Sequence, residues 1–445
     1  MTYQEFKNCI IIRCGELGVT DYELYYQAAE STSVSAYQQE INQFSGALEG
    51  GVCFRCIQNG KMGYAATEHL SEKSAAKLVE RALDNAASLE AEEPVFLNEG
   101  GKTYAQLPEP EVRIPGTDVL VDTVLTAQKQ LYEADPAVID GCTTQGVAER
   151  SEIAIFNSRG LDLYDETVLV GLVVAAVVSD GGEMANDYQI ELGDLDTIDT
   201  QSLTKKAAKA ALAKLGGEPA PTGRYPVIFD PEAMSDLLST FSCVFSAENA
   251  RKGLSRLAGK EGEAVATGTV TLVDDPAYPG SFLQRSFDAE GSPAFRKNII
   301  ENGRLNTLLY DLKNGALSGR ETTGNASKAN YDSSVGIQPF TLYLAAGEMS
   351  EEELLAKAGN GVYINSLGGL HAGANPVSGD FSLQSAGFLI EDGKKTSRVK
   401  SFTVAGNFYE LLQNIACVAD NLEFPGMGTV GSPSVLVEGL SVAGK

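Results

Sequence analysis

Two histidines, His69 and His371, are the only ones in this chain of 445 residues. His371 lies in GGLHAGANPVSGDFSLQSAGF, where Ser378 and Asp380 follow it on a glycine-rich backbone. Serine, histidine and aspartate are the groups of a nucleophilic hydrolase triad. The segment nevertheless lacks the G-x-S-x-G turn that exposes such a serine in many hydrolases. Three interpretations of this loop stay open: a triad, a loop that contacts a ligand or peptide, and a structural turn.

A pair of carboxylates, Asp288 and Glu290, forms a second candidate within FDAEG. On a strand, residues two apart share a face, so the pair could bind a cation or a peptide amine. The more common use of such a pair is a solvated turn. A zinc site needs three or four good ligands, and neither H-E-x-x-H nor H-E-x-x-x-H occurs in the chain. The sequence therefore predicts no metal site.

The bulk composition excludes some classes of partner. The formal charge of −26 repels phosphate backbones and anionic headgroups, so we expect neither nucleic-acid nor membrane binding. No apolar run approaches the ~20 residues of a membrane helix, and the first residues do not resemble a signal peptide. The seven cysteines are an odd number in a long chain, which favours free thiols. These features predict a cytoplasmic protein.

Hairpins and separate helices alternate along the chain. Three hairpins share an Asn/Asp-Gly-Lys/Arg turn, the strongest short hairpin signal; the turns fall at 59–61, 302–304 and 392–394. Asp230 followed by Pro231 predicts the start of a helix whose apolar stripe continues to Phe245. Apolar residues at helical spacing predict further helices over about 6–17, 71–90, 118–134, 200–216 and 408–422.

Antiparallel strands interrupted by separate helices predict an α+β fold. We expect two domains with mixed or antiparallel sheets and flanking helices. The first spans 1–220, and the second, 221–445, is richer in strands and carries most of the motifs. The boundary falls in EPAPTGRYP, which is typical of a linker. Neither a G-x-G-x-x-G unit nor a Walker loop follows a predicted strand, which argues against a nucleotide-binding domain.

Several motifs together resemble those of the TldD/PmbA family, once described as modulators of DNA gyrase, and most of all its PmbA (TldE) branch. They are F-D-x-E-G, T-G-N-A, H-x-G-x-N-P-x-S-G-D-F-S and A-G-N, at 287–291, 323–326, 371–382 and 405–407. The resemblance is strong across 280–430. It is weaker but colinear in the first half, where GVCFRCIQNGKMGYAAT carries it.

The resemblance implies two α+β domains and dimers that enclose a cavity. It also implies a cytoplasmic metallopeptidase system that acts on short or unfolded peptides. In that system a TldD-type subunit carries zinc on an H-E-x-x-x-H helix with a late cysteine ligand, and a TldE-type subunit lacks these groups. Here Leu238 and Ser239 fall near the first His-Glu pair, Cys243 falls near the second His, and 424–433 holds no cysteine.

We therefore expect this chain to bind no cofactor and to hold no catalytic residue, with zinc in a TldD-type partner. Its expected role is to form the wall of the cavity and to contact substrate, gripping extended peptides by strand addition. The residues expected to do so are His371, Asn375, Ser378, Asp380, Asp288 and Glu290. Two alternatives remain: a homodimeric peptide-binding protein without hydrolysis, and a metal-independent hydrolase that uses His371, Ser378 and Asp380.

Overall fold

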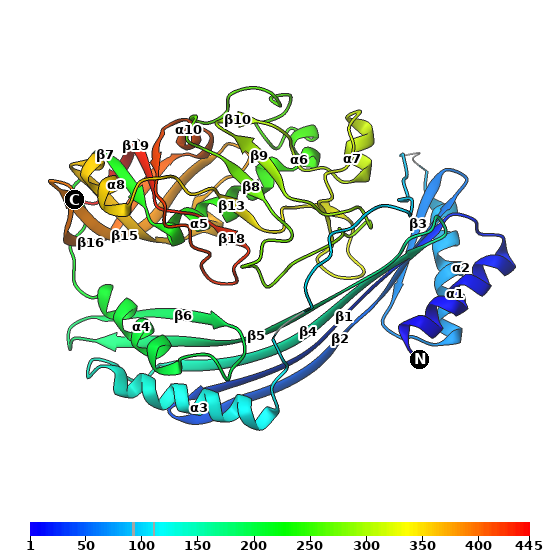
Figure 1. Cartoon of the computed structure of the whole chain (residues 1–445), viewed down its shortest axis with the longest axis horizontal. Coiled ribbons are helices and arrows are strands. Elements are labelled where there is room, and N and C mark those ends of the chain that lie inside the picture. Colours follow the sequence, from blue (N-terminus) through cyan, green and yellow to red (C-terminus); the bar gives the residue numbers. More distant parts are fainter. Residues whose placement is uncertain (91–93, 110–111) are drawn as a thin grey trace.

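The computed structural model describes residues 1–90, 94–109 and 112–445. Its first half is built on one long antiparallel sheet with strand order β3-β2-β1-β4-β5-β6. Figure 1 shows these strands as a curved band along which the second half of the chain lies. The strands are β1 (Tyr22–Tyr37), β2 (Glu40–Gln58), β3 (Lys61–Thr67), β4 (Thr143–Asn157), β5 (Asp162–Ser179) and β6 (Met184–Leu192).

Helices cover one face of the long sheet at its two ends (Figure 1). Side chains alternate between the two faces of a strand. On β5, Leu172 and Val174 are buried in the core beneath α3 and α4, whereas Asp165 and Thr167 contact the second half of the chain. Both faces of the sheet are therefore covered, one by helices and the other by the second half of the chain. Its helices are α1 (Tyr3–Leu17), α2 (Glu72–Ser88), α3 (Thr117–Ala134) and α4 (Thr200–Ala213).

The second half contains a mixed sheet of order β16-β15-β14-β7-β19-β17. β14 pairs parallel to β7, and β16 pairs with β19 as well as with β15, so this sheet closes on itself. The strands are β7 (Gly223–Phe229), β14 (Gly361–Gly368), β15 (Asp380–Glu391), β16 (Lys394–Asn407), β17 (Ile415–Val418) and β19 (Val435–Ala443).

A second sheet, of order β10-β9-β8-β13-β18, lies beside the closed sheet (Figure 1). Its strands are β8 (Leu272–Asp274), β9 (Lys297–Glu301), β10 (Arg304–Leu305), β13 (Leu342–Leu344) and β18 (Val430–Gly431). A separate pair is formed by β11 (Ala326–Ser327) and β12 (Gly336–Ile337). The helices of this half are α5 (Pro231–Phe241), α6 (Ala247–Arg251), α7 (Leu312–Leu317), α8 (Glu351–Ala358), α9 (Leu370–Gly373) and α10 (Phe408–Gln413).

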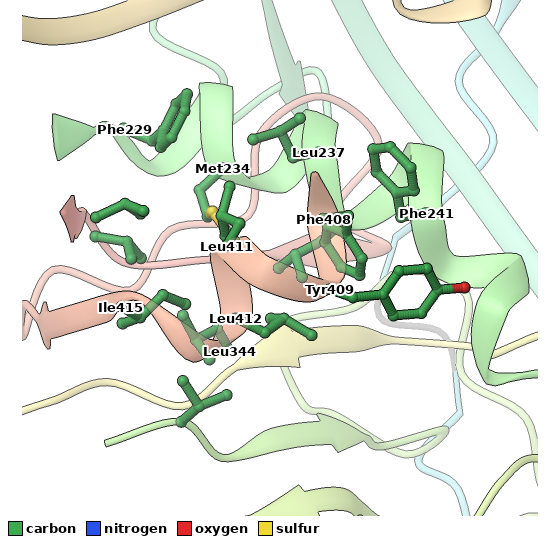
Figure 2. Close-up of a cluster of buried hydrophobic side chains, with 14 of the residues drawn as sticks. Phe229, Met234, Leu237, Phe241, Leu344, Phe408, Tyr409, Leu411, Leu412 and Ile415 are labelled. Atoms are coloured by element: carbon green, nitrogen blue, oxygen red, sulfur yellow. The ribbon is translucent and has the colours of Figure 1, made fainter. Parts of the chain in front are cut away.

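The core of the second half lies where α5 packs against α10. The rings of Phe241 and Phe408 stack with centroids 4.5 Å apart, and both side chains are fully buried. Figure 2 shows Met234 and Leu237 of α5 facing Leu411 of α10. This packing fixes α5 as a rigid element, with one side in the core and the other free to form a site.

The α+β class is confirmed, and so are several local predictions. Each predicted hairpin turn has two residues at positive φ, as a type I′ turn requires; they are Asn59-Gly60, Asn302-Gly303 and Asp392-Gly393. The Asp230 carboxylate accepts the Ala233 N–H at 2.8 Å and caps α5, with Pro231 at the first helical position. The division into two domains at residue 220 stays a prediction; α4 ends at Ala213 and β7 begins at Gly223.

The predicted helix over 408–422 is wrong beyond its first turns. α10 ends at Gln413, and the chain continues as β17, which pairs antiparallel with β19 through Ile415 and Val418. The apolar residues of this segment follow the helical period, yet the chain from Ile415 forms a strand. Pairing with a buried neighbouring strand decides between the two, and that partner lies beyond the local sequence window.

Candidate functional site

A cleft separates the long sheet from α5. It consists of two neighbouring cavities of ≈ 350 and ≈ 390 Å³ that share Ser239, Thr429 and Val430. The first cavity, the basic cavity, is also lined by Tyr25, Gln27, Asp165, Arg285, Asp288 and Lys328. The second, the acidic cavity, is also lined by Tyr188, Asp230, Glu232, Ser235, Asp236 and Glu423. Both volumes fall in the range of about 300–1,000 Å³ that small-ligand sites occupy.

The sequence of α5 places polar groups on the cleft. Glu232, Asp236 and Ser239 are four and three residues apart, so they share one face of the helix. Leu237 and Leu238 are buried in the core on the other side. Ser239 is exposed and lies at the junction of the two cavities. A single helix thus positions both the core contacts and the polar wall.

Carboxylates dominate the acidic cavity. Burial raises the pKa of Asp230 to about 7, against a hydrogen bond from the Ala233 N–H that lowers it. Burial also raises the pKa of Asp236, and the pKa of Glu232 is raised by burial and by the nearby carboxylates of Asp187 and Asp236. Among the described residues no ion pair offsets the charge of Glu232 or Asp236, since Lys214 pairs with Asp187 instead.

The basic cavity contains two cations. The Arg285 guanidinium donates to Thr167 Oγ1 at 2.6 Å, and the Lys328 ammonium lies 5.0 Å from the centre of the Tyr25 ring. Burial lowers the pKa of both groups. The charge of Asp165 acts on Arg285, but the hydrogen bonds to this carboxylate come from the N–H and the hydroxyl of Ser286.

Asp288 organises the wall of the basic cavity. One carboxylate oxygen accepts the N–H groups of Glu290 and Ser292 at 2.9 and 2.8 Å, and the other accepts the Ala326 N–H at 3.0 Å. Burial raises its pKa to about 6 despite these hydrogen bonds. Asp288 therefore joins the F-D-x-E-G segment to the T-G-N-A segment.

Glu290 has a different environment. Its carboxylate accepts the Leu312 N–H at the start of α7 at 2.9 Å and lies 3.6 Å from Arg55 of β2. Arg55 also pairs with Glu23 at 2.7 Å, so this group links the two halves of the chain. Asp288 and Glu290 are 2% and 5% exposed, which makes their interpretation as a solvated turn wrong. They are buried because distant segments fold over them, which their local sequence does not reveal.

The loop after His371 forms a closed turn. Asn375 Oδ1 accepts the N–H groups of Val377 and Ser378 at 3.0 and 3.3 Å. Asn407, at the end of β16, donates to the Ser378 carbonyl and to the Asp380 carboxylate, both at 2.8 Å. The hydrogen bonds from Asn407 and Ser378 lower the pKa of Asp380. The H-x-G-x-N-P-x-S-G-D and A-G-N motifs are thus one hydrogen-bonded unit.

The structure brings Ser378 and Asp380 together, but not as parts of a triad. The Ser378 hydroxyl accepts the Asp380 backbone N–H at 3.3 Å, and within the described residues no hydrogen bond joins His371 to either side chain. His371 is exposed on α9, which packs against α5. Of the six residues predicted from sequence, only Asp288 lines the cleft.

Arg285, Lys328 and Asp236 were not predicted as functional residues from the sequence. Arg285 lies two residues before F-D-x-E-G and Lys328 two residues after T-G-N-A, and this proximity was the available signal. In the described ranges no three His, Cys, Asp or Glu side chains converge as metal ligands. A membrane-spanning helix is likewise not found among the described residues.

The fold and cleft define an α+β protein with a ligand-sized site between a long antiparallel sheet and a closed mixed sheet. Three family models match this chain: PmbA/TldA metallopeptidase domain 1 over 22–86, the central domain over 111–215 and the C-terminal domain over 222–444. The chain belongs to the PmbA/TldD metallopeptidase family.

Individual relatives resemble the chain over nearly its whole length. A Thermotoga maritima structure described as a modulator of a DNA gyrase is 31% identical, with a TM-score of 0.90, and the match covers 99% of this chain and 100% of that one. TldE from Thermococcus kodakarensis is 26% identical, with a TM-score of 0.86, covering 98% and 99%. A metalloprotease of Methanothermobacter thermautotrophicus is 28% identical, covering 91% of this chain and 88% of the relative.

Proposed function

We propose that this chain is the TldE-like subunit of a cytoplasmic two-component metallopeptidase that acts on short or unfolded peptides. In this proposal a TldD-type partner supplies the zinc, and this chain supplies the wall of the cavity and contacts to substrate. The observation that carries it is the chemistry of α5 and the turn after it. Where the family resemblance places zinc donors, the chain has Leu238, Ser239 and Cys243.

These residues do not fit a hydrolytic zinc ion. Such a site uses three protein ligands and a carboxylate base beside the metal-bound water. Leu238 is 1% exposed in the core and has no donor atom. Cys243 is half-buried, and burial raises the pKa of its thiol, which disfavours the thiolate that binds metals. Neither histidine lines the cleft.

The edge of the long sheet supports a role in binding extended chains. β6 is the last strand of that sheet, and Tyr188, Gln189 and Ile190 of β6 line the acidic cavity. An edge strand presents unpaired backbone N–H and C=O groups, which can pair with an extended peptide. A folded protein has few free backbone groups to offer, so this mode of binding favours short or unfolded substrates.

Reconstitution tests the proposal. The full chain is purified alone and together with an H-E-x-x-x-H-bearing relative from the same cell, and cleavage of an unstructured polypeptide is measured with and without a chelator. The proposal predicts that the chain alone is inactive, that the two chains co-purify, and that the complex cleaves until the chelator is added. Cleavage by the isolated chain in the presence of chelator, lost on His371→Ala, would instead establish the metal-independent hydrolase.

The same purification separates the heteromeric subunit from a homodimeric binding protein. Light scattering on the isolated chain reports its own assembly, and affinity capture reports the second chain. Peptide binding by a homodimer that captures no zinc-bearing relative would favour the binding protein and contradict the two-component proposal.

A further inference from the structure

The two cavities of the cleft differ in charge, because the described residues line the acidic cavity with carboxylates and no cation, and the basic cavity with two cations together with the carboxylates of Asp165 and Asp288. In the acidic cavity the carboxylates of Asp230, Glu232, Asp236 and Glu423 face the same space. In the basic cavity Asp165 accepts hydrogen bonds from Ser286 and Asp288 accepts them from backbone N–H groups, and among the described residues no ion pair joins Arg285 or Lys328 to a carboxylate. The chain has 34 basic and 60 acidic residues, so two neighbouring cations outside such ion pairs are unexpected on composition alone. This distribution indicates a ligand that carries both charges.

An unpartnered hydroxyl marks the acidic cavity independently of its carboxylates. Ser235 lines this cavity and is 5% exposed. In the part of the chain that the structure describes, its Oγ has no hydrogen-bond partner. A buried polar group without a partner destabilises the folded state, because it has lost its hydrogen bonds to water. A ligand donor that reaches this oxygen would offset part of this destabilisation.

An ammonium group suits the acidic cavity better than a metal ion does. No metal-ligand cluster of three His, Cys, Asp or Glu side chains occurs among the described residues, so the carboxylates do not converge on one point. An ammonium has three N–H donors that can reach separated acceptors. Lys214 is the nearby cation, and it pairs with Asp187 at 3.2 Å, which leaves Glu232 and Asp236 for a ligand.

We propose that the cleft binds a short peptide in one direction, with its free α-ammonium group among Glu232, Ser235 and Asp236 and its carboxylate end toward Arg285 and Lys328. The peptide backbone then passes the exposed Ser239, where the two cavities meet. That the ligand is a peptide rests on the proposed function. The new elements are the direction in which the peptide binds and its need for a free N-terminus.

Calorimetric titration of the full chain tests the direction. The probes are tetraalanine with free termini, its N-acetyl form and its C-terminal amide. We expect N-acetylation to weaken binding at least about tenfold, which is about 1.4 kcal/mol. In the Glu232→Gln/Asp236→Asn double variant the free peptide binds more weakly and acetylation has no further effect, as a thermodynamic cycle requires for interacting groups.

A parallel experiment tests the basic cavity, which is expected to hold the carboxylate end of the peptide. Amidation of the C-terminus weakens binding to the wild-type chain but not to Lys328→Met. Glu391→Gln and Lys394→Met remove exposed charges from the β15–β16 turn and serve as controls that behave like the wild type. Thermal unfolding of each variant shows whether it is folded, and a double variant that does not fold is replaced by Asp236→Asn alone.

Four results would overturn the inference. Equal binding of the free and acetylated peptides would refute the direction while leaving peptide binding, and so the proposed function, intact. Equal weakening by acetylation in the wild type and the double variant would place the ammonium elsewhere. Tight binding of an acetylated peptide with one lysine would assign the acidic cavity to a side chain. If no peptide binds in any form, the proposed role in substrate contact fails as well.

Discussion

Replacing the capping carboxylate of α5 by an amide should stabilise the protein at neutral pH. Asp230→Asn keeps a side-chain oxygen for the Ala233 N–H, since asparagine caps helices as well as aspartate does. It removes a charge whose pKa burial raises from 3.8 to about 7. The folded state therefore holds a proton that the unfolded state releases between these values, and the unfolding free energy of the wild type falls as pH rises through this window.

The magnitude follows from the size of the shift. From 3.8 to about 7 the shift corresponds to about 4 kcal/mol, at about 1.4 kcal/mol per pH unit. The side chain is half-buried at the positive end of a helix, which favours its charged form, so we expect about half of that, ~2 kcal/mol. The variant should gain this stability progressively between pH 4 and pH 7 and keep it above pH 7.

Urea unfolding at several pH values between 4.5 and 8 measures the effect, with Asp199→Asn as the control. Asp199 caps α4 from an exposed position, so its replacement should change stability little at any pH. If Asp230→Asn is less stable than the wild type at pH 8, or if its advantage does not change with pH, the assignment of a half-buried cap with a raised pKa is wrong.

Substitutions at three further positions test contacts that hold the second half of the chain together. Phe241→Ala removes the ring stacked on Phe408 and should cost about 3–5 kcal/mol in urea unfolding; a loss under 1 kcal/mol would mean that α5 is not anchored there. Glu290→Ala leaves the Leu312 N–H without its acceptor and should cost about 2 kcal/mol, whereas Glu290→Gln, which keeps an acceptor, should cost less. Gly379→Ala adds a Cβ 2.5 Å from a Tyr409 ring atom at a φ of +80° and should lower stability by at least about 1 kcal/mol; an unchanged midpoint would refute the turn geometry.

Local signals in the sequence were sufficient for the elements that local physics determines. The Asn59-Gly60 turn needs two residues at positive φ, and few residue pairs other than Asn-Gly satisfy that. The start of α5 is likewise encoded by Asp230 and Pro231 alone. The segment after Gln413 was mispredicted because its strand exists only through pairing with β19, which follows it in the chain.

The residues that line the cleft could not be predicted from the sequence for a related reason. Its lining comes from β1, from the segments beside F-D-x-E-G and T-G-N-A, and from α5, which are brought together only by the packing of the long sheet against the second half. The resemblance identified the motif residues, but the structure uses Asn375, Ser378 and Asp380 to close a turn. Lys328, two residues beyond a motif, faces the cavity instead.

We infer that this chain has no zinc site of its own, and elemental analysis of the isolated full chain is the decisive test. The chain is separated from any co-purifying partner, incubated with excess zinc, desalted and assayed for metal per chain. We expect no zinc above the buffer blank, because Leu238, Ser239 and Cys243 cannot form a ligand set. One tightly held zinc per chain, lost on Cys243→Ser, would contradict it.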